Sequence, residues 1–131
     1  MNEGKKHKIL IIDDDVKLSS MIQAGLQQYG YEVLRENVST RGVAAAEIFS
    51  PDLVLLDLDM PDMDGGTVAA EMRGNSKTKD IPIIFLSGLM RKSEVEAVGG
   101  KMSGRVCLAK PAKISEITEK IEGILGKLNS L

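Results

Sequence analysis

The sequence predicts a three-layer α/β fold, in which a parallel β-sheet is covered by helices on both faces. Short, unbroken runs of branched apolar residues recur along the chain, and such runs are typical of strands buried on both faces. The segments between them repeat apolar residues at three- and four-residue steps, as amphipathic helices do. Strands that alternate with helices over short connections indicate right-handed crossovers between parallel strands.

Five strands are expected from the apolar runs. Three runs are strong, and the runs at Tyr31–Leu34 and Val106–Ala109 are weaker. In chain order, we expect strands at Ile9–Ile12, Tyr31–Leu34, Leu53–Leu56, Ile83–Leu86 and Val106–Ala109. Each is followed by a helical segment, so the predicted order is strand then helix, repeated five times.

The helices are predicted from apolar stripes and from residues that favour helix ends. The first helix has the stripe Leu18, Met21, Ile22, Leu26 and Tyr29, and the last has Ile114, Ile117, Ile121, Ile124 and Leu128. The expected N-caps of the first three helices are Asp15, Ser39 and Asp64, and the expected stops are Gly30, Pro51 and Gly74. The segment Arg91–Gly104 has a weak period and the pair Gly99–Gly100, so we expect only a short or mobile helix there.

Length and composition favour one folded domain, residues 1–131 with a core at about 8–127. The 17 basic and 19 acidic residues give a net charge of −2, which is no footprint for direct nucleic-acid binding. A single cysteine forms no internal disulfide, and no apolar run is long enough for a signal peptide or membrane insertion. We therefore expect a cytoplasmic protein.

Polar residues follow four of the predicted strands at the point where each ends. They are Asp13–Asp15, Asp57, Ser87 and Lys110. The carboxyl ends of parallel strands meet at one edge of a sheet, which is where such folds bind ligands. Clustered carboxylates without His or Cys suit Mg²⁺, and an aspartate beside a metal, a lysine and a hydroxyl suits acceptance of a phosphoryl group.

Four motifs in this order, ILIIDDD, DLVLLDLDMPDMDG, PIIFLSG and CLAKP, resemble the receiver domain of two-component response regulators. The resemblance runs from about Lys8 to Lys127. It implies a flavodoxin-like, doubly wound sheet of five parallel strands in the order 2-1-3-4-5, with five helices. It also implies a phosphorelay function, in which a histidine kinase or a histidine phosphotransfer protein donates a phosphoryl group.

The resemblance assigns roles to the residues at the strand ends. Asp57 matches the phosphoacceptor, and Ser87 and Lys110 match the hydroxyl and the ammonium beside it. The implied Mg²⁺ ligands are Asp13, Asp14, Asp57 and the backbone carbonyl of Asp59. The lysine and the proline after it match a pair whose peptide bond is often cis in the family.

The resemblance also implies an output surface on the fourth helix, fifth strand and fifth helix, which would bind a downstream protein. One residue departs from the family pattern. Many receivers have an aromatic residue three positions before the lysine, and this chain has Cys107. A ring that moves inward on activation is therefore absent at that position.

Two other functions are compatible with parts of this pattern. Asp57 and Asp59 resemble the Asp-x-Asp motif of haloacid-dehalogenase-type phosphohydrolases, in which the first aspartate is the nucleophile. That family has its acidic metal pair late in the chain, whereas Asp13 and Asp14 come first here. A receiver fold that no longer accepts phosphate would lack one of the site residues, and all are present. Because the sequence stops soon after the last predicted helix, it fits either a stand-alone receiver or the receiver segment of a longer protein.

Overall fold

The protein is described by a computed structural model that covers residues 6–102 and 105–126. The strands are β1 (Lys8–Ile12), β2 (Glu32–Glu36), β3 (Leu53–Asp57), β4 (Ile83–Ser87), β5 (Lys101–Met102) and β6 (Arg105–Ala109). The helices are α1 (Val16–Gln28), α2 (Gly42–Phe49), α3 (Gly65–Arg73), α4 (Lys92–Ala97) and α5 (Ile114–Leu125), with a 3₁₀ turn at Ser39–Arg41. None of the helices among these residues is long and apolar enough to cross a membrane.

The sheet has the strand order β2-β1-β3-β4-β6-β5. Its five long strands, β1 to β4 and β6, are parallel. Because β6 is the fifth of the long strands along the chain, their order is the 2-1-3-4-5 that the resemblance implies. The sheet has one additional short strand, β5, which pairs with β6 in the antiparallel direction. The sequence analysis did not predict it. It is two residues long, too short for its sequence to show a strand pattern, and it follows the positive-φ residues Gly99 and Gly100.

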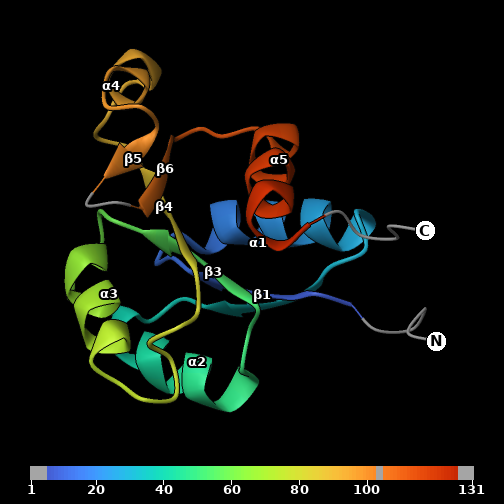
Figure 1. The fold of residues 1–131 in the computed structure, drawn as a ribbon, viewed down its shortest axis with the longest axis vertical. Coiled ribbons are helices and arrows are strands. Elements are labelled where there is room, and N and C mark those ends of the chain that lie inside the picture. Colours follow the sequence, from blue (N-terminus) through green and yellow to red (C-terminus); the bar gives the residue numbers. More distant parts are fainter. Residues whose placement is uncertain (1–5, 103–104, 127–131) are drawn as a thin grey trace.

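Helices cover both faces of the sheet, with α1 and α5 on one face and α2 and α3 on the other (Figure 1). Neighbouring residues of β1 point to opposite faces. Ile11 packs in a core with Ile22 of α1 and Ile117 of α5. Leu10 and Ile12 pack in a second core with Val68 of α3. Both faces are therefore apolar, which explains why the strand sequences are unbroken apolar runs.

Most of the predicted helix ends are confirmed. The side chains of Asp15 and Asp64 each accept a hydrogen bond at 2.9 Å, from the N–H groups of Leu18 and Thr67. The prediction for Ser39 was wrong. Ser39 is buried at the start of the 3₁₀ turn, and α2 begins three residues later without a side-chain cap.

The apolar stripes were predicted too broadly. Met21 and Tyr29 are 66 % and 51 % exposed, because Met21 faces away from Ile22 and Leu26 and Tyr29 stands after the last residue of α1. In α5, Ile124 lies in the last turn and is 39 % exposed. The prediction for Leu128 lies outside the described residues. Helix α4 has six residues, as short as its sequence suggested.

Candidate functional site

The polar residues at the strand ends meet at the carboxyl edge of the sheet. Asp13 follows β1, Asp57 ends β3, Ser87 ends β4 and Lys110 follows β6. Because β1, β3, β4 and β6 are neighbours in the sheet, parallel pairing brings these four residues together. The backbone N–H of Lys110 also donates to the carbonyl of Ser87 at 2.8 Å, which fixes the loop after β6 beside β4.

Three carboxylates form a compact cluster at this edge. Asp13, Asp14 and Asp57 each offer an oxygen, and these oxygens lie within 4.8 Å of one another. Asp13 and Asp57 are buried, whereas Asp14 is exposed, so the cluster opens to solvent on one side. Converging oxygen ligands with an open side fit a hard ion such as Mg²⁺, which keeps several of its waters. The residues present therefore fit the metal that the sequence predicted.

Lys110 bridges two of the carboxylates. Its Nζ lies 3.0 Å from Oδ2 of Asp13 and 3.2 Å from Oδ1 of Asp57, and its side chain is 16 % exposed. Burial acts to lower the pKa of Lys110, but its contacts with Asp13 and Asp57 outweigh burial and raise that pKa. Lys110 is therefore a fixed positive charge in the site.

Asp13 is a fully buried carboxyl group at the end of β1. Burial raises the pKa of Asp13 to about 6. The N–H of Asp15, which donates to Asp13 at 2.9 Å, and the ammonium of Lys110 only partly oppose that effect. A second cation in the cluster would stabilise the charged form of Asp13 further.

The structure adds a contact that the sequence analysis missed. The side chain of Asp59 points across the site to the loop after β4, where its Oδ2 accepts hydrogen bonds from Gly88 N–H (2.7 Å) and Ser87 Oγ (3.3 Å). The sequence analysis assigned the backbone carbonyl of Asp59 to the metal site and gave no partner for its carboxylate. A backbone N–H leaves no mark in a sequence, so the partner Gly88 could not be found from residue types.

Two backbone features shape the loops around the cluster. The peptide bond between Lys110 and Pro111 is cis, as the resemblance implied. At Gly65, a Cβ atom would collide with the carbonyl oxygen of Asp57, so only glycine lets α3 begin this close to β3.

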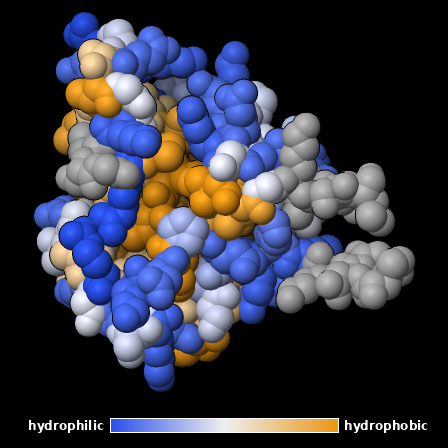
Figure 2. Space-filling view, in the orientation of Figure 1, coloured by the Kyte–Doolittle hydropathy of each residue, from blue (hydrophilic) through white to orange (hydrophobic). Residues whose placement is uncertain are grey.

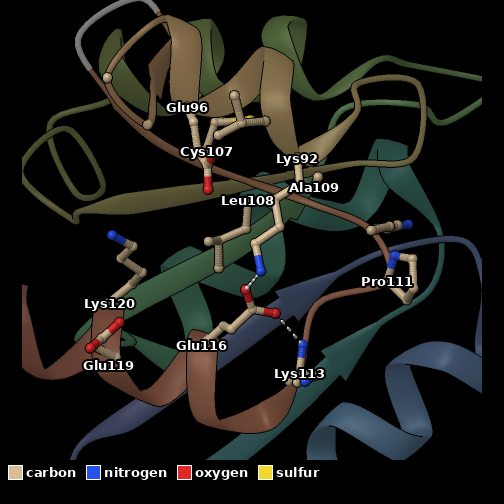
Figure 3. A pocket seen from close by; sticks show the side chains of 14 residues that line it. Lys92, Glu96, Cys107, Leu108, Ala109, Pro111, Lys113, Glu116, Glu119 and Lys120 are labelled. Carbon is tan, nitrogen blue, oxygen red and sulfur yellow. Dashed lines mark hydrogen bonds and ion pairs between the residues drawn. The ribbon is translucent and has the colours of Figure 1, made fainter.

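A groove of about 640 Å³ lies beside the site, between α4 and α5 (Figures 2 and 3). Its floor includes Val95, Cys107 and Leu108, and Figure 2 shows hydrophobic side chains in a hollow flanked by hydrophilic ones. Lys92 of α4 and Glu116 of α5 form an ion pair of 2.9 Å across the groove (Figure 3). Lys110 also lines the groove, so the groove and the carboxylate cluster share a side chain.

Comparison with known proteins identifies the family. The sequence model of the response regulator receiver domain matches residues 9–122. Over 124 residues the chain is 32 % identical to RpaA of Synechocystis, a DNA-binding dual master transcriptional regulator; the match covers 95 % of this chain and 51 % of RpaA. It is 31 % identical over 119 residues to PilH of Pseudomonas aeruginosa, covering 90 % of this chain and 97 % of PilH. The chain thus spans about half the length of RpaA and nearly all of PilH.

Solved structures have the same fold. Chemotaxis protein CheY4 of Vibrio cholerae superimposes with a TM-score of 0.78 at 27 % identity, covering 92 % of this chain and all of CheY4. The receiver domain of the sensor histidine kinase PA1611 of Pseudomonas aeruginosa gives a TM-score of 0.78 at 27 % identity, covering 94 % of this chain and all of that domain. That domain has a magnesium ion coordinated in its active-site cleft.

These matches do not support the haloacid-dehalogenase alternative. The family model covers both the early acidic pair and the later Asp57, and the fold brings Asp13 and Asp14 beside Asp57 as a receiver does. The chain belongs to the response regulator receiver domain family, the phospho-accepting modules of two-component signal transduction.

Proposed function

We propose that Asp57 accepts a phosphoryl group from a phosphohistidine of a histidine kinase or a histidine phosphotransfer protein. A carboxylate oxygen of Asp57 attacks the phosphorus, the P–N bond of the donor breaks, and the leaving imidazole takes up a proton. The observation that carries this proposal is the position of Asp57, buried between two other carboxylates and an ammonium at the open carboxyl edge of the sheet.

The residues around Asp57 would also promote the transfer. Lys110 and the N–H of Asp59, which donates at 3.0 Å, hold Oδ1 of Asp57 in a fixed orientation. Asp13, Asp14, Asp57 and the carbonyl of Asp59 would hold Mg²⁺, which when bound neutralises charge on the phosphoryl oxygens. Lys110 and the Ser87 hydroxyl would bind phosphoryl oxygens. The protein would in this way catalyse its own phosphorylation and slow dephosphorylation.

Acyl phosphate mapping tests the assignment of Asp57. The protein is incubated with acetyl phosphate and Mg²⁺, and the modified residue is identified by mass spectrometry. We expect one added phosphoryl group on the parent and none on Asp57→Asn. The control variant Asp62→Asn changes an exposed carboxyl of the same loop and should be modified like the parent. Equal labelling of Asp57→Asn and the parent would refute the assignment.

For the downstream partner, we propose an amphipathic segment of another protein that binds the groove between α4 and α5. The apolar floor suits apolar side chains. The rim carries both signs of charge and suits a partner of mixed charge; its charged residues are Lys92, Lys113, Lys120, Glu96, Glu116 and Glu119. Phosphorylation would change the groove through Lys110, which lines both it and the site.

A pair of variants tests this surface. Glu119→Lys reverses the charge of an exposed glutamate on the groove rim and should weaken partner binding without loss of phosphorylation at Asp57. Glu71→Lys makes the same change at an exposed glutamate of α3, away from the groove, and should have no effect on either. Partner binding that Glu119→Lys leaves unchanged would move the output surface elsewhere.

A further inference from the structure

The carboxylate of Asp59 occupies two hydrogen-bond donors that lie next to the proposed phosphoacceptor. Its Oδ2 accepts from the backbone N–H of Gly88 at 2.7 Å and from the hydroxyl of Ser87 at 3.3 Å. Its own backbone N–H donates to Oδ1 of Asp57 at 3.0 Å. Asp59 therefore connects the loop that carries the acceptor with the loop after β4.

The two donors form a small oxyanion-binding site. A backbone N–H and a hydroxyl converge on one carboxylate oxygen, and a Cβ built on Gly88 would lie 3.8 Å from Oδ2 of Asp59 and 3.9 Å from Cδ of Lys110. The ammonium-bearing chain of Lys110 thus borders the same opening. A hydroxyl and an N–H each have a single hydrogen to donate, so they cannot serve Asp59 and an arriving phosphoryl oxygen together at full strength.

The geometry points to an autoinhibitory role for this carboxylate: in the unphosphorylated protein, Asp59 occupies the donors of the phosphoryl oxygens, and phosphoryl acceptance requires it to leave Ser87 and Gly88. This inference rests on the proposed function of Asp57. It gives Asp59 a role beyond that of its carbonyl, because its carboxylate binds Ser87 and Gly88, whereas the clustered carboxylates are those of Asp13, Asp14 and Asp57.

Displacement of Asp59 would also release the loop after β4. The hydroxyl oxygen of Ser87 accepts a hydrogen bond from the N–H of Leu89 at 3.2 Å, so Asp59 is linked through Ser87 to the residues that follow. Leu89 is 82 % exposed and Gly88 is exposed, so these two residues are held by polar contacts and not by burial. With Cys107 in place of an aromatic residue, this loop offers a direct route by which phosphorylation reaches α4.

Affinity for a phosphoryl mimic tests the inference. Beryllofluoride with Mg²⁺ is titrated into the parent, Asp59→Ala, Asp59→Asn and Asp62→Asn, and binding is measured by calorimetry. Both substitutions at Asp59 keep the backbone carbonyl, so the proposed metal ligands are unchanged. We expect about tenfold tighter binding by Asp59→Ala, because the donors are free, and a smaller gain for Asp59→Asn, whose amide oxygen still accepts a hydrogen bond. Asp62→Asn, which removes the same charge from an exposed position of the loop, should bind like the parent.

Amide spectra without any mimic supply a second readout. The amide protons of Gly88 and Leu89 should shift in Asp59→Ala and stay in place in Asp62→Asn. In the parent, the mimic should shift Ser87, Gly88 and Leu89 more than Val106, Cys107 and Leu108 of β6.

The outcomes separate the two proposals. A parent that binds no beryllofluoride, or binds it as well with Asp57→Asn, overturns the proposed function. If the parent binds at Asp57, equal or weaker binding by Asp59→Ala overturns the autoinhibitory role, as does the same gain from Asp62→Asn. Gly88 and Leu89 amides that are unmoved by Asp59→Ala would likewise contradict it.

Discussion

Lys110 and Asp13 form an ion pair of 3.0 Å between Nζ and Oδ2. This ion pair links the loop after β6 to the end of β1. Asp13 is fully buried, and Asp57 lies within reach of the same ammonium at 3.2 Å. Two carboxylates at this distance from one cation repel each other less than they would alone. Lys110 therefore stabilises the site in the absence of a bound metal or phosphoryl group.

Replacement of this lysine should destabilise the metal-free protein. Lys110→Ala leaves Asp13 and Asp57 without their cation, so we expect the free energy of unfolding to fall by about 2 kcal/mol. Added Mg²⁺ should stabilise the variant more than the parent, because the metal replaces the missing charge. Urea unfolding with EDTA and with Mg²⁺ measures both effects. Lys79→Ala, at an exposed lysine far from the site, is the control; a Lys110→Ala variant as stable as that control would contradict the prediction.

The buried carboxyl of Asp13 should make stability depend on pH. The pKa of Asp13 is raised from 3.8 to about 6 in the folded protein, mainly by burial. Between these values the folded state holds a proton that the unfolded chain has lost, so the free energy of unfolding falls as the pH rises through this window. The loss is on the order of 3 kcal/mol.

Asp13→Asn isolates this effect, because asparagine does not titrate. The difference in the free energy of unfolding, variant minus parent, should grow from about pH 4 to pH 6 and then level off, in the presence of EDTA. Titrating groups that do not interact with Asp13 contribute equally to both proteins and cancel. A difference that stays flat over this range would show that Asp13 is not the titrating group.

Mg²⁺ binding should depend on Asp14, the exposed member of the carboxylate cluster. Asp14→Asn removes charge from the cluster, so we expect the metal-free variant to be about 1 kcal/mol more stable than the parent and to gain less from Mg²⁺. Thermal unfolding with and without Mg²⁺ gives both quantities, and Asp62→Asn serves as the matched control. A parent whose Tm does not rise with Mg²⁺ would count against the metal site.

Two glycines should respond in opposite directions to alanine. Gly65→Ala places a methyl group against the carbonyl oxygen of Asp57 and should lower the free energy of unfolding by about 2 kcal/mol. Gly123→Ala has nothing within 4 Å of the added methyl group and lies inside α5, so it should raise stability by about 0.5–1 kcal/mol. The two denaturation curves measured together check the prediction; a neutral Gly65→Ala would mean that α3 can shift away from β3.

The sequence by itself determined the five parallel strands and most of the site. Apolar runs that need cover on both faces identify the strands, and the polar residue that ends each run is a local feature of the chain. Asp13, Asp57, Ser87 and Lys110 could be assigned to one edge because parallel strands share a direction. Helix caps such as Asp15 were also predictable, since a cap bonds to an N–H three residues away.

Only the tertiary structure decided the contacts between those residues. The hydrogen bond from Ser87 to Asp59 joins positions 28 residues apart. The second hydrogen bond to Asp59 is donated by the backbone N–H of Gly88, a group that every residue except proline has. The strand β5 exists only because β6 is beside it. The local sequence shows which positions of a segment are polar and which are apolar. The direction of a side chain depends instead on the partners that tertiary packing brings close to it. For that reason the sequence predicted Asp59 as a carbonyl ligand, and the fold was needed to show where its carboxylate points.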